Sequence, residues 1–194
     1  GGFVLQPSST TLAEILQRRG WETAAFIGAS ILKKGFGLNQ GFAVYDDEMP
    51  KSAGSGLAGE YPERRAGVVV DRAVSWLGKQ SGKPFFLWVH LYDPHSPYDP
   101  PSPFREKYGA RSYDGEVAYS DQQVGRLLEA VQRKSPSGNT LIVALSDHGE
   151  SLSEHGEYSH GVFLYDSTLR IAFMMSGPGV PKGLRVKQQV RTID

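Results

Sequence analysis

The chain has 194 residues, of which 39% are hydrophobic and 22% are charged, a composition typical of a globular domain with a buried core. Its 21 acidic residues balance its 21 basic residues, so the net charge creates no electrostatic field that favours binding of nucleic acid. No apolar run approaches the roughly 20 residues that span a bilayer. The absence of cysteine excludes disulfides, thiolate metal sites and thiol nucleophiles. Recognition must therefore come from a local site.

The first elements are a helix and a buried strand. Thr11 and Glu14 fit a capping box at the start of a helix over 11–19, which Gly20 ends. Residues 22–28 form a short apolar run bounded by glycines, which predicts a buried strand. These two segments make one step of an alternating helix and strand pattern.

A less regular stretch follows the first strand. Between residues 29 and 64 glycines, prolines and charges increase while periodicity fades, which favours a long surface excursion, assigned to 46–64. Several charged residues in this part of the chain are expected to be solvated. They are the acidic turn Asp46-Asp47 and the basic pairs Lys33-Lys34 and Arg64-Arg65.

The alternation of helices and strands continues to the end of the chain. Apolar residues at helical spacing predict helices over 70–77 and 117–131. Continuous apolar runs predict strands over 84–91, 140–145 and 171–175. Helices that alternate with buried strands imply an α/β fold, a mostly parallel sheet sandwiched by helices, within a single domain over 1–194.

All five histidines lie between residues 90 and 160, and most of them stand just past the ends of predicted strands, where open α/β sheets bind ligands. His90 lies inside a strand and is interpreted as a hydrogen-bonded core histidine. His95 follows in a loop with Pro94 before it and Pro97 after it, which restrict the backbone around the imidazole. This arrangement favours a preorganised contact of His95 with an anion or a metal.

Two more polar clusters follow the strand over 140–145. Asp147 and His148 are adjacent at its end, and Gly149 allows a sharp turn, so both side chains can reach one divalent cation. The next loop carries His155 and His160. His155 is equally well explained as part of a solvated loop, whereas His160 is favoured as a site residue.

Together these segments resemble the sulfatase family of the alkaline-phosphatase-like superfamily in both order and spacing. The segments that carry the resemblance are FFLWVHLYDPHSPY (85–98), SDHGESL (146–152), EHG (154–156) and SHG (159–161), with framework segments TLAEIL (11–16), GWETAAF (20–26) and GPGV (177–180). The resemblance implies an α/β core that binds a divalent metal, and an alcohol-type nucleophile that attacks sulfur or phosphorus in an ester.

Residue roles follow from the same resemblance. Asp147 and His148 match a metal-ligand pair, with calcium the expected metal and manganese or zinc the alternative. His95 and His160 match catalytic residues that contact the sulfuryl or phosphoryl oxygens or the leaving group. His155 is a weaker candidate for substrate binding. The implied substrate is a small-molecule, glycan or aryl ester.

The sequence departs from the family pattern at the nucleophile. The family motif is Cys- or Ser-x-Pro-x-Arg, and the similar run Pro101-Ser-Pro-Phe-Arg105 has proline at the place of the nucleophile. The early acidic metal pair is also missing. The chain is therefore expected to lack the N-terminal nucleophile segment and the C-terminal subdomain of the family, and to be inactive on its own.

The resemblance leaves several functions open. The leading interpretation is metal-dependent hydrolysis of sulfate esters by the parent protein. Alternatives within the superfamily are a phosphodiesterase or phosphonate monoester hydrolase and a phospho-head-group transferase. An alternative of another class is a non-catalytic metal- or anion-binding module. The compartment and the oligomeric state are left open, and a periplasmic or secreted parent is compatible with the sequence.

Overall fold

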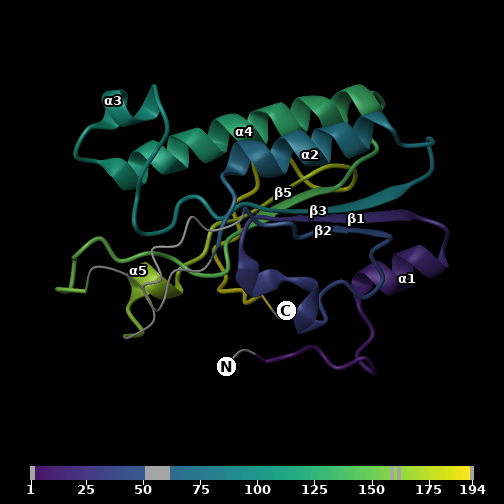
Figure 1. Ribbon diagram of the computed structural model, residues 1–194, viewed down its shortest axis with the longest axis horizontal. Helices are drawn as coiled ribbons and strands as arrows, with labels where there is room; N and C mark the ends of the chain where they lie inside the picture. The colour runs from purple at the N-terminus through teal and green to yellow at the C-terminus, as the bar shows by residue number, and fades with distance from the viewer. Residues whose placement is uncertain (1–2, 51–61, 158–159, 161–162, 193–194) are drawn as a thin grey trace. The chain divides into compact units, whose positions relative to one another are not determined.

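The computed structural model describes residues 3–50, 62–157, 160 and 163–192. Its contacts divide the chain into two compact units, unit 1 over residues 1–134 and unit 2 over residues 135–194 (Figure 1). The assignment of a single domain to 1–194 stays a prediction. Within the described residues, every helix is too short or too polar to cross a bilayer.

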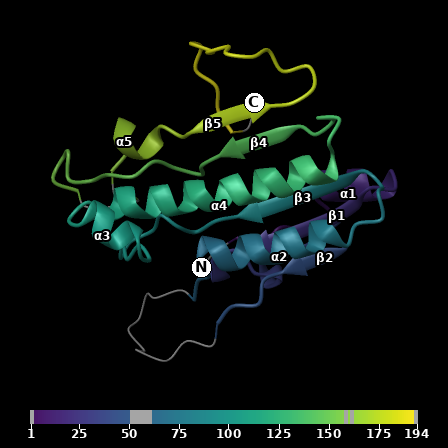
Figure 2. The same ribbon diagram turned by 90° about the horizontal axis from the view of Figure 1, so that it is seen from above.

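Unit 1 is built on a parallel three-stranded sheet. The central strand β1 (Glu22–Ile27) lies between β2 (Val44–Asp46) and β3 (Phe85–His90) (Figure 2). Five of the six residues of β1 are buried, as its apolar composition predicts. The strands over 22–28 and 84–91 were predicted. β2 was not, because it has only three residues and its Val44 is exposed.

Helices cover both faces of this sheet. The helix α1 (Leu12–Arg18) packs on β1 from one side, and α2 (Ala66–Gly78) packs on β1 and β3 from the other, where it also contacts α4 (Ser112–Lys134) (Figure 1). The core between α2 and β1 contains the buried residues Ala24, Phe26, Val69 and Ala73. Three shorter elements connect these parts: η1 (Ser30–Leu32), η2 (Lys34–Phe36) and α3 (Phe104–Tyr108).

The start of α1 follows from its sequence. The Thr11 hydroxyl accepts a hydrogen bond from the Glu14 backbone N–H at 3.1 Å, and the Glu14 carboxylate accepts from the Thr11 N–H at 2.8 Å. These reciprocal bonds satisfy two N–H groups that a helix end leaves without intrahelical partners. Gly20, with φ +82°, follows the helix and adopts a backbone conformation that favours glycine. The predicted capping box is confirmed.

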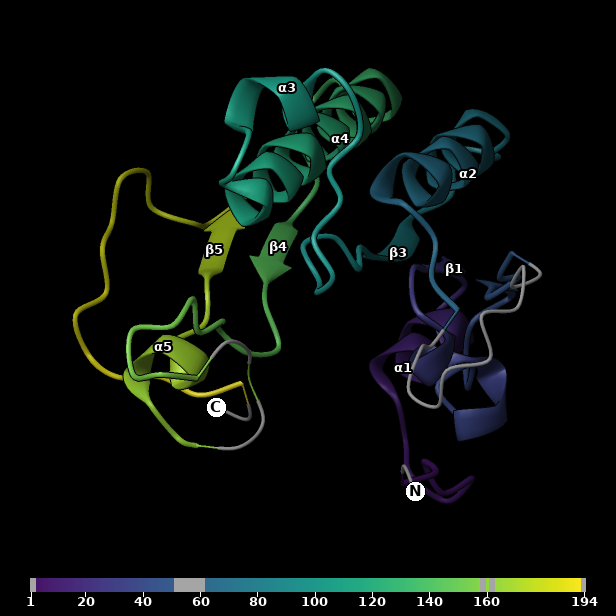
Figure 3. The same ribbon diagram turned by 60° about the vertical axis from the view of Figure 1, so that its left-hand side comes forward.

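Unit 2 contains a two-stranded sheet. Its strands β4 (Ile142–Leu145) and β5 (Phe173–Ser176) are antiparallel, and the short helix α5 (Asp166–Leu169) lies between them in the chain (Figure 3). Strands were predicted over 140–145 and 171–175, but their antiparallel pairing was not. The long connection between these strands, which includes α5, allows either direction, so the sequence does not decide the pairing.

Two charged residues that were predicted to be solvated are buried or half-buried. Arg64 is 3% exposed, and its Nη1 lies 2.5 Å from the Asp46 carboxylate. Its Nε donates to the carbonyl of Ile27 at 2.8 Å, at the end of β1. The prediction was wrong for this pair because Asp46 belongs to β2, and a buried guanidinium requires an acidic partner. Residues 51–61 of the predicted surface excursion over 46–64 lie outside the described residues.

Candidate active site

The loop after β3 carries the first candidate residue. His90, the last residue of β3, packs between the rings of Trp88 and Tyr92. His95 is half-buried further along this loop, and its ring stacks on Tyr92 with centroids 4.1 Å apart. The chain therefore holds one imidazole in the sheet and presents a second one beyond its carboxyl edge.

The hydrogen bonds of His95 define its tautomer. Its Nδ1 lies 2.7 Å from the backbone carbonyl of Ser96, which can only accept, so Nδ1 carries a proton. Its Nε2 lies 2.9 Å from the Tyr92 hydroxyl, which donates to Nε2 when the ring is neutral. Both ring nitrogens therefore have a partner, and an ester oxygen would have to replace the Tyr92 hydroxyl to reach Nε2.

A buried carboxylate supports this loop from α4. Glu116 is 3% exposed and accepts hydrogen bonds from the backbone N–H groups of His95 at 3.1 Å and Asp99 at 2.8 Å. Burial raises the pKa of Glu116, and the two backbone hydrogen bonds oppose this rise only in part. The guanidinium of Arg65 lies 3.4 Å from the same carboxylate. Sequence reasoning missed Glu116, because one glutamate on a long polar helix looks like a surface residue.

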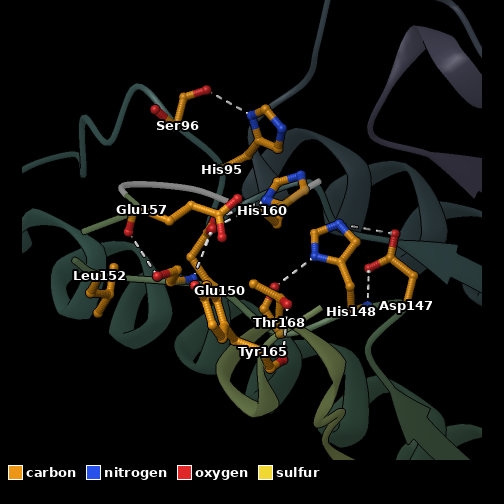
Figure 4. A network of polar contacts seen from close by, with 12 residues as sticks. His95, Ser96, Asp147, His148, Glu150, Leu152, Glu157, His160, Tyr165 and Thr168 are labelled. Atoms are coloured by element: carbon orange, nitrogen blue, oxygen red, sulfur yellow. Dashed lines mark hydrogen bonds and ion pairs between the residues drawn. The ribbon is translucent and has the colours of Figure 1, made fainter. Parts of the chain in front are cut away.

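The second group of candidate residues follows β4 in unit 2. The Nδ1 of His148 lies 2.7 Å from the carbonyl of Gly149 and must donate to it, which leaves a lone pair on Nε2 (Figure 4). That Nε2 lies 3.7 Å from Oδ2 of Asp147, whose side chain is 81% exposed. A nitrogen and an oxygen with available lone pairs thus stand side by side at the strand end.

His160 joins this pair within unit 2. Its ring centroid lies 3.9 Å from that of His148, and its Nδ1 lies 3.1 Å from the Glu150 carboxylate (Figure 4). The Glu150 side chain is only 8% exposed, so it holds the His160 ring from the protein side. His155 is exposed and stacks on Tyr165, with centroids 4.2 Å apart. Unit 2 therefore brings together three of its four predicted site residues, with His148 in contact with both Asp147 and His160.

The Asp147 and His148 pair fits a divalent cation in part. Metal–oxygen and metal–nitrogen bonds are about 2.0–2.6 Å long, so two ligand atoms 3.7 Å apart can contact one ion. A backbone carbonyl that accepts the other ring N–H is also the usual support of a metal-bound histidine. Among the residues that the structure describes, no group of three or more acidic and imidazole side chains is placed to hold an ion. The pair alone would be an incomplete site.

The chain has acidic and imidazole side chains in the loops that follow its strands. In α/β proteins with open sheets, ligands bind at the carboxyl ends of the strands, so the chain fits this class of ligand-binding proteins. Comparison with known proteins narrows this class. The profile of the family described as Sulfatase matches residues 3–194. The chain belongs to the sulfatase family.

The chain is also similar to individual proteins and solved structures. An arylsulfatase from Clostridium perfringens is 24% identical over 152 residues, which cover 57% of this chain and 31% of that protein. An alkaline phosphatase superfamily protein from Vibrio parahaemolyticus superimposes with a TM-score of 0.61 at 23% identity, over 88% of this chain and 42% of that one. The phosphonate monoester hydrolase of Agrobacterium radiobacter gives a TM-score of 0.67 at 19% identity, over 91% and 54%.

These structural likenesses confirm the predicted α/β fold. The chain spans about a third of the length of the arylsulfatase, since the aligned part is 31% of it. The activity of the whole protein is therefore given below as a proposal.

Proposed function

We propose that this chain forms part of a metal-dependent enzyme that hydrolyses sulfate esters. Membership of the sulfatase family supports this reaction. The observation that carries the proposal is the contact of His148 with both the Asp147 carboxylate and the His160 ring. Such a group suits an anionic ester bound next to a cation.

The nucleophile would come from outside these 194 residues. The sequence contains no cysteine, and Pro101 occupies the nucleophile position of the only similar motif that we identify. The 194 residues alone are therefore proposed to be inactive. Unit 2 is proposed to hold a cation and to provide a histidine for the ester.

Each of these side chains has a role that follows from its hydrogen bonds. Asp147 and His148 would hold the divalent cation, which supplies positive charge for the anionic oxygens of the ester. The Nδ1 of His160 is held by Glu150, which fixes the ring, and the ring is proposed to contact an ester oxygen. The Nε2 of His95 in unit 1 is proposed to protonate the departing oxygen.

The proposed substrate is a small-molecule, glycan or aryl sulfate ester, and the proposed cation is calcium. A carboxylate oxygen suits calcium, whereas an imidazole nitrogen also suits manganese or zinc. The fold shared with a phosphonate monoester hydrolase favours hydrolysis of phosphate or phosphonate esters as the second candidate function. The two candidates differ in substrate and metal, so one assay separates them.

The assay compares an aryl sulfate with the matched aryl phosphate, using the intact protein after chelation and separate return of calcium, manganese or zinc. Sulfate turnover that returns with calcium is the expected result. Preferential phosphate turnover with manganese or zinc would favour the second candidate. No turnover with any metal would reject both and leave the non-catalytic metal- or anion-binding module.

The metal role of Asp147 has its own test. In Asp147→Asn, loss of the negative charge is expected to weaken binding of the cation at least about tenfold, because affinity depends on the charge and number of ligands. Metal content after dialysis, measured by elemental analysis, reads this out without any substrate. Asp166→Asn, which alters an exposed carboxylate on α5 in the same unit, is the matched control. Equal metal content in both variants would contradict the role of Asp147.

A further inference from the structure

We propose that Glu116 is a positioning residue that holds His95 in place for the reaction, an inference that rests on the proposed function. Glu116 lies on α4, and His95 lies in the loop after β3. The carboxylate contacts the backbone of His95 rather than its ring. It therefore acts on the chemistry only through the orientation of His95.

The two oxygens of Glu116 hold two points of the same loop. Oε2 accepts from the His95 N–H at 3.1 Å, and Oε1 accepts from the Asp99 N–H at 2.8 Å. The loop from 95 to 99 is thus closed over one buried carboxylate. An amide in its place would direct an N–H group at one of these two donors, so glutamine preserves the shape of Glu116 but not both hydrogen bonds.

The start of the loop is fixed to the same helices by Asp93. Its Oδ2 accepts from the Ala66 N–H at 2.6 Å, in the first turn of α2, and its backbone carbonyl accepts from the Ser120 hydroxyl of α4 at 2.8 Å. The guanidinium of Arg65 lies 3.4 Å from the carboxylates of both Asp93 and Glu116. Arg65 therefore offsets the cost of burying two negative charges close to one another.

This arrangement gives His95 a defined position before an ester binds. The loop takes its place from two helices of unit 1, while the ring is oriented by Ser96 and Tyr92. A misplacement of about 1 Å at a catalytic group can lower the rate about a hundredfold. Release of the backbone at His95 should therefore reduce turnover even though every side chain that touches the ester is retained.

The test is Glu116→Gln in the intact protein, with kcat and KM measured on an aryl sulfate. We expect kcat to fall about tenfold to a hundredfold, the equivalent of one hydrogen bond to a charged group, with little change in KM. In the His95→Ala background the same substitution should leave kcat unchanged. Glu129→Gln, an exposed glutamate of α4 that pairs with Arg133 at 3.7 Å, should behave like the wild type.

Amide hydrogen exchange provides a readout that does not depend on activity. Glu116→Gln should lower the protection of the His95 and Asp99 amides about tenfold or more. The milder variant Ser120→Ala, which loses only the bond to the Asp93 carbonyl, should lower kcat by less and covers the case in which Glu116→Gln fails to fold.

The outcomes separate the two proposals. Absence of wild-type turnover would reject the proposed function, and the exchange measurement would still decide whether Glu116 holds the loop. If the wild type is active but Glu116→Gln lowers kcat by the same factor with and without His95, Glu116 has a general structural role and the inference is overturned. Unchanged protection of both amides would overturn it as well.

Discussion

Turnover of sulfate esters by the intact protein is expected to fall about 10²–10⁴-fold when His95 is replaced by alanine, the usual range for removal of a general acid or base. The Nδ1 of His95 donates to the Ser96 carbonyl. In the imidazolium form Nε2 can then donate to the leaving oxygen in place of the Tyr92 hydroxyl, which lies 2.9 Å from it. Alanine removes this proton donor and leaves the loop backbone in place.

The measurement for His95→Ala is steady-state turnover of an aryl sulfate, with metal content and thermal unfolding as checks on the fold. Ser96→Ala is the matched control, because Ser96 contributes only its backbone carbonyl to His95 and alanine retains it. Turnover of His95→Ala close to that of the control would remove His95 from the mechanism. A loss that disappears with esters of very acidic alcohols would identify His95 as the group that protonates the leaving oxygen, since such alcohols leave without protonation.

Substitution of Arg64 by methionine is expected to destabilise unit 1 by about 3–5 kcal/mol, the usual cost of breaking a buried ion pair. Arg64 joins the ends of two neighbouring strands, because its guanidinium contacts the Asp46 carboxylate in β2 and the Ile27 carbonyl in β1. Methionine fills a similar volume but leaves both acceptors without this donor. The loss is read as a lower urea midpoint for unfolding at an unchanged slope.

The control for Arg64→Met is Arg126→Met. Arg126 lies 2.5 Å from Asp71, but both side chains are about half exposed or more, at 48% and 62%, so this pair is worth about 0–1 kcal/mol. Equal destabilisation by the two substitutions would contradict the view that burial of Arg64 sets its importance.

The ion pair of Arg64 and Asp46 makes the stability of the fold depend on pH. Burial raises the pKa of Asp46, but hydrogen bonds from Arg72 and Arg64 outweigh it, so the pKa lies below the ordinary value of 3.8. A carboxyl group with a lowered folded-state pKa stabilises the fold above its unfolded pKa, and this contribution is lost as the pH falls through the folded-state value. In Arg64→Met the loss of stability in acid should therefore be smaller than in the wild type.

Local signals allowed much of the fold to be predicted. The capping box of Thr11 and Glu14, and the apolar run that forms β1, depend on neighbours in the sequence. The burial of Arg64 and the pairing of β4 with β5 depend on contacts between residues that are far apart in the chain. Periodicity carries no information about such contacts, which explains why both were missed.

The residues of the candidate site also fall into those that the sequence predicts and those that only the structure reveals. Asp147 and His148 are adjacent in sequence. Their position at the end of a strand predicts that both side chains can reach one divalent cation. The His160 ring lies 3.9 Å from the His148 ring, and the roles of these three residues stay a prediction from the resemblance to sulfatases. The roles of Glu116 and Glu150 were not predicted, because each becomes apparent only when a distant backbone or ring is brought against its carboxylate.

The loop that presents His148 is fixed by main-chain atoms, and this has a consequence for evolution. The Gly149 N–H donates to the Thr168 carbonyl at 2.8 Å, and the Gly149 carbonyl accepts from His148. A side chain at Gly149 would collide with the carbonyl oxygen of Ser167. That oxygen belongs to the main chain, so a different side chain at 167 would not remove the collision. Descendants of this protein that keep this loop conformation are therefore expected to keep the glycine at 149.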